Sequence, residues 1–256
     1  MTENFKNIYN QSYTNFYNTC KYKDLISNSP IPYILSKDAK TTGEYNNGMV
    51  IIKEDSINSS INTIKSTLYH EFTHYYDESV FKELKYSEKD IKVLMLTFSE
   101  IHASYNSIFA FLNFNNLSVH NRIKMDKVIY NGHKLSQLCN SQANDFISKM
   151  NGILGFKYSM YLLGERRAML KISSNPLEVN RIYNNTRIPK LIRDEILSID
   201  KLVILDKPEN IDIPLLDTLK LKAETNLMKY SVNNLPPLPD IEGMDEIKDI
   251  LNSLQN

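Results

Sequence analysis

The chain has little cysteine, little glycine and no tryptophan: two Cys, seven Gly and no Trp in 256 residues. Cys20 and Cys139 form no C-x-x-C pair, so we expect two reduced thiols and no disulfide or cysteine-based metal site. An excess of charge is also missing, because 30 Lys and Arg residues balance 30 Asp and Glu residues. Without a basic field, we expect no nucleic-acid partner and no anionic membrane surface.

Long hydrophobic runs are missing as well. No stretch reaches the roughly 18 apolar residues that a membrane-spanning helix needs, and the nearest one, residues 153–163, is interrupted by Lys157. The first six residues are polar and lack the apolar segment of a signal peptide. These absences predict a cytoplasmic protein. Its 42% apolar and 23% charged residues are ordinary for a globular chain that can bury a sizeable core.

What the chain does contain is one H-E-x-x-H pattern, in which His70, Glu71 and His74 are the three defined residues. On an α-helix, this spacing places the two imidazoles one turn apart on one face, where both can bind a single Zn²⁺. Glu71 is rotated away from that face, so it can act as a general base on a water beside the metal. The pattern therefore predicts one zinc ion with His70 and His74 as ligands and Glu71 as the catalytic residue.

A catalytic zinc ion needs a third protein ligand and one open position. The longer pattern H-E-x-x-H-x-x-G-x-x-H is excluded, because Asp77 and Val80 occupy its glycine and third-histidine positions. The alternative is a glutamate on a later helix. Four glutamates follow the motif within the next thirty residues or so: Glu78, Glu83, Glu88 and Glu100.

Glu100 is the favoured third ligand, because it alone lies inside a strongly apolar helical pattern, where burying an unpaired carboxylate is costly. Small residues on its helical face would let this helix approach the histidine helix closely. The other three acids are expected in or beside the connecting loop, exposed to solvent. His102 is the alternative ligand, but it lies about 200° around the helix from Glu100, so the two cannot face the same metal.

Three further residues are candidates for supporting roles. Asp77 follows His74 by three residues and could orient a ligand histidine, or could simply end the helix. Tyr158 and Tyr161 flank Gly164 in an apolar helix, and either could donate a hydrogen bond to the oxyanion of a transition state. Packing in the core is the competing interpretation for both tyrosines.

The periodicity of apolar residues predicts an α+β fold that is predominantly helical. We expect strands at residues 31–36 and 48–53, joined by a turn at 37–47, and helices at 4–27, 57–77, 89–113, 119–149, 152–171, 187–200 and 213–230. The strand before the motif helix is expected to be an exposed edge that can pair with an extended peptide. We expect a catalytic domain at 1–175 and a helical region at 176–256, with a proline-rich linker at 232–241 and a terminal amphipathic segment at 243–254.

The segments H-E-F-T-H-Y-Y-D (70–77) and S-E-I-H-A-S-Y (99–105) resemble those of gluzincin-type zinc metallopeptidases. They are most similar to the compact ImmA/IrrE-like peptidases of phages and mobile elements, although Thr73 stands where that family often has glycine. The resemblance covers about residues 30–115. It implies a zincin-like core and a zinc-dependent endopeptidase, a hydrolase that acts on a particular protein or peptide substrate. The alternative from another class is a catalytically idle zincin-fold binding module with a structural zinc.

Overall fold

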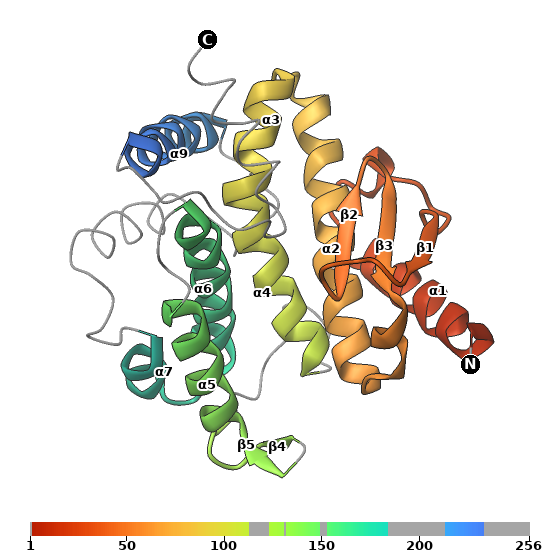
Figure 1. Ribbon diagram of the computed structural model, residues 1–256, viewed down its shortest axis with the longest axis vertical. Helices are drawn as coiled ribbons and strands as arrows, with labels where there is room; N and C mark the ends of the chain where they lie inside the picture. Colours follow the sequence, from red (N-terminus) through yellow and green to blue (C-terminus); the bar gives the residue numbers. More distant parts are fainter. Residues whose placement is uncertain (1, 113–122, 131, 149–152, 184–212, 233–256) are drawn as a thin grey trace.

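Helices packed side by side make up most of the structure, and a small sheet lies at one end of the row (Figure 1). The computed structural model describes residues 2–112, 123–130, 132–148, 153–183 and 213–232. The α-helices are α1 (Thr2–Thr19), α2 (Ile61–Glu83), α3 (Glu88–Leu94), α4 (Glu100–Phe111), α5 (Leu135–Ser148), α6 (Ile153–Ile172), α7 (Pro176–Tyr183) and α9 (Ile213–Val232). The strands are β1 (Tyr33–Ser36), β2 (Gly43–Asn46), β3 (Met49–Lys53), β4 (Ile129–Tyr130) and β5 (His133–Lys134). The predicted class, α+β with a predominance of helix, is confirmed.

The main sheet contains a strand that the sequence did not predict. β3 is central and pairs in parallel with β1 and antiparallel with β2. β2 forms because Asn47 and Gly48 have φ angles of 45° and 83°, the left-handed values that a two-residue hairpin turn needs. The prediction of a plain turn at 37–47 was therefore wrong, and so was the prediction that the strand before the motif helix is an edge. The edge strand beside that helix is β2.

Aromatic side chains of α1 join the sheet to α2. Tyr9 is buried, donates a hydrogen bond of 3.0 Å to the carbonyl of Ile31, and meets the ring of Phe72 edge-on at 5.2 Å. Tyr13 makes a similar edge contact with Phe72 at 5.1 Å. Because Phe72 lies inside the H-E-x-x-H segment, this aromatic cluster fixes the back of the helix that carries the two histidines.

The motif helix is longer than predicted at its C-terminal end. It begins after Ser60, whose side chain caps it by accepting a hydrogen bond of 3.2 Å from the backbone N–H of Thr63. The predicted start near residue 57 was early, because residues 54–58 form a 3₁₀ turn. At the other end, Glu78 lies within α2 and is half-buried, whereas we had expected it in or beside the connecting loop and exposed. Glu83 is the last residue of the helix and is exposed beside that loop, as predicted.

Helix α4 lies in the middle of the row, between α2 and α6 (Figure 1). The predicted helix at 89–113 is present as α3, a π-helical turn η3 (Met95–Ser99) and α4. The predicted helix at 119–149 is wrong over its first described part, where β4 and β5 form a hairpin around Gly132 with a φ of 79°. Only its second part, α5, is helical.

The C-terminal helices pack onto the same core. Val179 of α7 and Leu219 of α9 belong to one buried cluster with Phe109 of α4 and Met160 of α6. Residues on both sides of the predicted domain boundary at 175 thus share a core, and the division itself stays a prediction. The predicted helix at 187–200, nearly all of the linker and the terminal segment lie outside the described residues. Among the residues that are described, no helix combines the length and apolar character needed to cross a membrane.

Candidate metal centre

The two histidines of the motif lie on one face of α2. Their rings are 4.7 Å apart between centroids and meet at 84°. Both rings are largely buried, with side-chain exposures of 13% for His70 and 10% for His74. The spacing of four residues on a regular helix is sufficient to bring the two Nε2 atoms toward a common point.

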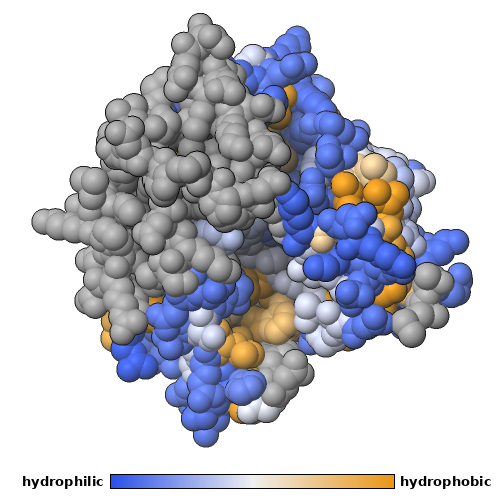
Figure 2. Space-filling view, in the orientation of Figure 1, coloured by the Kyte–Doolittle hydropathy of each residue, from blue (hydrophilic) through white to orange (hydrophobic). Residues whose placement is uncertain are grey.

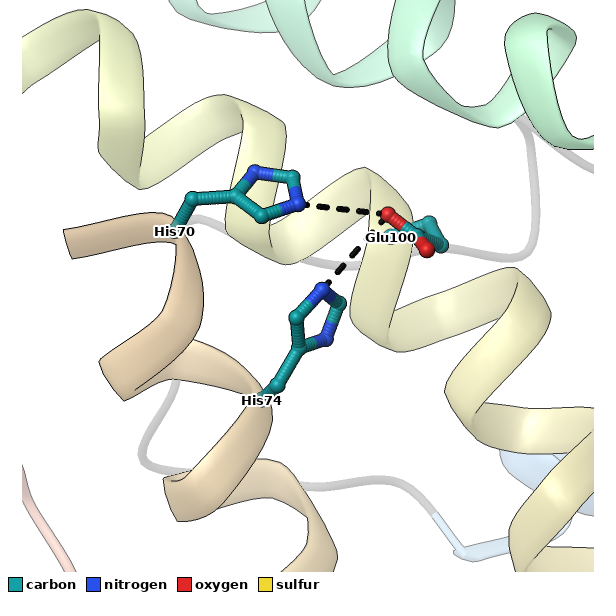
Figure 3. A group of neighbouring side chains, drawn as sticks. All are labelled: His70, His74 and Glu100. Atoms are coloured by element: carbon teal, nitrogen blue, oxygen red, sulfur yellow. Dashed lines mark ion pairs between the residues drawn. The ribbon is translucent and has the colours of Figure 1, made fainter. Parts of the chain in front are cut away.

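Glu100 of α4 completes the group, as predicted (Figure 3). Its Oε2 atom lies 3.4 Å from Nε2 of His70 and 3.6 Å from Nε2 of His74. For comparison, two ligands of a tetrahedral zinc ion with bonds of about 2.0–2.1 Å are about 3.4 Å apart. The three side chains therefore have the spacing and the donor atoms to hold one metal ion.

The hydrogen bonding of the buried Glu100 carboxylate is also what a metal ligand would show. Its Oε2 atom is buried and has no hydrogen-bond partner among the residues that the structure describes. Burial alone would raise the pKa of Glu100, but the charges of Lys157 and His74 outweigh burial and hold that pKa well below its ordinary value. The carboxylate is therefore ionised at neutral pH, and a cation at the centre would satisfy the oxygen that lacks a hydrogen bond.

The π-helical turn before α4 supplies a partner for one ligand. Ser99, its last residue, is buried, and its Oγ lies 2.8 Å from Nδ1 of His74. A hydrogen bond at Nδ1 fixes the orientation of the imidazole and leaves Nε2 directed at Glu100. Short π-helical turns of this kind often occur at functional sites, because they shift the side chains that follow.

Glu71, the predicted catalytic residue, is buried beside the three ligands. Its negative charge contributes to raising the pKa of both His74 and Tyr161, so it acts on the same small volume. The edge strand β2 passes directly over it: a Cβ atom on Gly43 would lie 3.1 Å from Oε1 of Glu71. The same Cβ atom would lie 2.5 Å from Cγ2 of Thr67, so a glycine favours this close approach of the strand to α2.

Helix α6 closes the other side of the centre. The ring of Tyr161 stacks on His70 at 5.3 Å between centroids with an angle of 17°. Burial raises the pKa of Tyr161 well above its ordinary value, and the charge of Glu100 adds to this rise. The hydroxyl therefore keeps its proton at neutral pH and can donate a hydrogen bond. One turn earlier, Nζ of Lys157 lies 3.1 Å from Oε1 of Glu100.

The remaining predicted residues have other partners. Asp77 was a candidate for orienting a ligand histidine, but its carboxylate contacts Nδ1 of His102 instead, at 2.9 and 3.1 Å. The group of possible metal ligands found among the described residues contains Glu100 and not His102. Tyr158 packs against the main core cluster, with its ring 6.3 Å from that of Tyr161. Of the two candidate tyrosines, only Tyr161 stacks on a ligand.

Three contributors to the site were missed by the sequence analysis: Ser99, Lys157 and β2. No residue pattern identifies Ser99 or Lys157, since each is brought to the site by packing between helices. A signal for β2 was available, because Asn-Gly between short polar and apolar segments is typical of a tight hairpin.

No protein-family model, curated protein or solved structure matches the chain. The resemblance to gluzincin-type peptidases therefore stays a prediction. Inference about function depends on the geometry of this centre.

Proposed function

We propose that the chain is a zinc-dependent endopeptidase of the gluzincin type. The observation that carries the proposal is the convergence of His70, His74 and Glu100, whose buried Oε2 atom has no hydrogen bond within the described part of the chain. Two imidazoles and one carboxylate are a common ligand set for catalytic zinc, and they leave a coordination position for water. Structural zinc sites, by contrast, are usually closed by four protein ligands.

A zinc ion held by these ligands would polarise the scissile carbonyl and make the attacking water more acidic. Glu71 accepts the proton of that water and later gives it to the leaving amine. Tyr161, whose hydroxyl stays protonated, donates a hydrogen bond to the oxyanion that develops on the carbonyl oxygen when the water attacks. Its stacking on His70 supports this role, because it fixes the ring at the rim of the ligand group.

The substrate is an extended peptide segment that pairs with β2. This strand is an edge of the sheet in the described part of the chain, so one side of its backbone is available for pairing. It also passes over Glu71 at Gly43, which would bring a paired peptide next to the catalytic carboxylate. Figure 2 shows this face of the molecule hollowed over α4, between the sheet on one side and the helices on the other.

The test compares the intact chain with Glu71→Gln, a substitution that keeps the side-chain size and removes the base. Bound zinc is measured by elemental analysis, and cleavage is measured on a broad library of extended peptides. We expect zinc in both proteins, cleavage by the intact chain only, and loss of cleavage on chelation. Zinc without cleavage by either protein would indicate a structural zinc in a binding module. Absence of zinc would reject both functions.

A further inference from the structure

Three residues on one face of α6 approach the metal centre from the side of α4. Lys157, Tyr161 and Gly164 are spaced by four and three residues, so they form a line along the helix. Gly164 is in contact with the α4 backbone: a Cβ atom there would lie 2.3 Å from the carbonyl oxygen of Ile101 and 2.7 Å from Cβ of Ser104. This close packing places Lys157 and Tyr161 against the ligands.

The two oxygens of Glu100 have different partners as a result. Oε2 faces Nε2 of His70 and Nε2 of His74, whereas Oε1 forms an ion pair of 3.1 Å with Lys157. The pair is well shielded, with side-chain exposures of 24% for Lys157 and 6% for Glu100. A shielded ion pair is screened less by water and salt than a surface pair, so it holds the carboxylate in one orientation.

A carboxylate can bind a metal ion through one oxygen or through both. Zinc does not resist a change in ligand number, because its filled d shell imposes no geometry, and it accepts five ligands when they are offered. Nothing about the histidines would therefore prevent Glu100 from turning both oxygens to the metal. The ammonium group of Lys157, 3.1 Å from Oε1, is in a position to prevent it.

We propose that Lys157 is a positioning residue that keeps Glu100 a one-oxygen ligand. Three protein atoms then occupy three positions of a tetrahedral ion, and the fourth stays open for water or substrate. If Lys157 is removed, Glu100 binds through both oxygens and the ion becomes five-coordinate with a water. This inference depends on the metal centre of the proposed function but not on peptide cleavage.

The test uses Co²⁺, which replaces zinc in such sites and has a visible absorption that is several-fold stronger in four-coordinate than in five-coordinate geometry. The intact chain and Lys157→Met are titrated with Co²⁺ after removal of other metals. We expect one strong band for the intact chain and a several-fold weaker band for Lys157→Met. In Lys157→Arg, which retains a cation for Oε1, the strong band should return. A role in folding alone would not change the band intensity per bound ion.

Lys37→Met is a matched control, because Lys37 forms an exposed pair with Glu54 at 3.9 Å, far more open to solvent at 82% and 45% exposure. Its band should equal that of the intact chain. Circular dichroism checks that each variant is folded, and Lys157→Gln replaces Lys157→Met if the latter is not.

Four results would overturn the proposal. They are an unchanged band in the neutral variant, loss of Co²⁺ binding by a folded neutral variant, a weak band in a folded Lys157→Arg, and no Co²⁺ binding by the intact chain. If the bands change as expected but no peptide is cleaved, the positioning role stands and the proposed peptidase activity fails.

Discussion

Glu165 of α6 is a buried acid outside the metal centre, and it gives the sharpest test of how this part of the chain is packed. Glu165 is only 4% exposed to solvent. One carboxyl oxygen accepts a hydrogen bond from the side-chain amide of Gln142 in α5, and the other is buried with no hydrogen-bond partner in the described ranges of the chain. Burial raises the pKa of Glu165 from 4.5 to about 8. The folded chain therefore keeps this carboxyl protonated and neutral at pH 7.

The raised pKa makes stability depend on pH in a definite direction. Below about pH 4.5, Glu165 is protonated in both the folded and the unfolded chain, and its contribution to stability is fully present. Between pH 4.5 and about 8, the unfolded chain releases the proton and the folded chain keeps it, so the free energy of unfolding falls as pH rises. The slope approaches about 1.4 kcal/mol per pH unit, and the total is about 5 kcal/mol.

Glu165→Gln keeps the shape and the carbonyl oxygen of the side chain but cannot ionise. The variant should therefore gain stability relative to the intact chain as pH rises. Its free energy of unfolding minus that of the intact chain should increase by several kcal/mol from pH 5 to pH 8.5. Urea unfolding at half-unit pH intervals measures it. Glu83→Gln, at an exposed position, is the control for removing one carboxyl. Parallel curves for Glu165→Gln and the intact chain would refute the assignment of a neutral, buried carboxyl.

Two further substitutions test the contacts around the metal ligands. Gly43→Ala would place a Cβ atom 2.5 Å from Cγ2 of Thr67 and 3.1 Å from Oε1 of Glu71, so β2 must move away from α2. We expect the free energy of unfolding to fall by about 1–3 kcal/mol and the kcat of the proposed peptidase to fall while its zinc content stays unchanged. An unaltered kcat would contradict this. Ser99→Ala removes the hydrogen bond to Nδ1 of His74. It should weaken zinc binding about 10–100-fold, as measured by competition with a chelator. Equal zinc affinity would show that the imidazole is oriented without this hydrogen bond.

The residues of the candidate metal centre could be predicted from the sequence because the information about them is local. His70 and His74 need only a regular helix to share a face. Glu100 was identified by its context, since an acid within an apolar helix requires a partner. The distance between the two helices was not predictable. It depends on contacts such as that of the Asn106 amide with Oγ1 of Thr73, at 3.0 Å.

The errors in the predicted fold have local causes that periodicity does not capture. β2 has the sequence Gly-Glu-Tyr-Asn, which has little apolar character, and it exists because a hairpin turn returns it to β3. The helix α2 continues past Asp77, where the sequence analysis ended it, because Val80 and Phe81 are buried in the core. In both cases a tertiary contact outweighed the local signal.

The contribution of α6 to the metal centre shows why motif analysis stops short of the whole site. Tyr161 was a candidate because it lies in an apolar helix near a glycine, but the sequence offered no reason to prefer it to Tyr158. The reason is the contact of Gly164 with the backbone of α4, which selects the face of α6 that meets Glu100. Lys157 and Tyr161 lie on that face, and Tyr158 lies against the core cluster. A lysine that interrupts an apolar run is usually exposed; here its ammonium group lies 3.1 Å from a buried carboxylate, a partner that only the packing of α6 on α4 supplies.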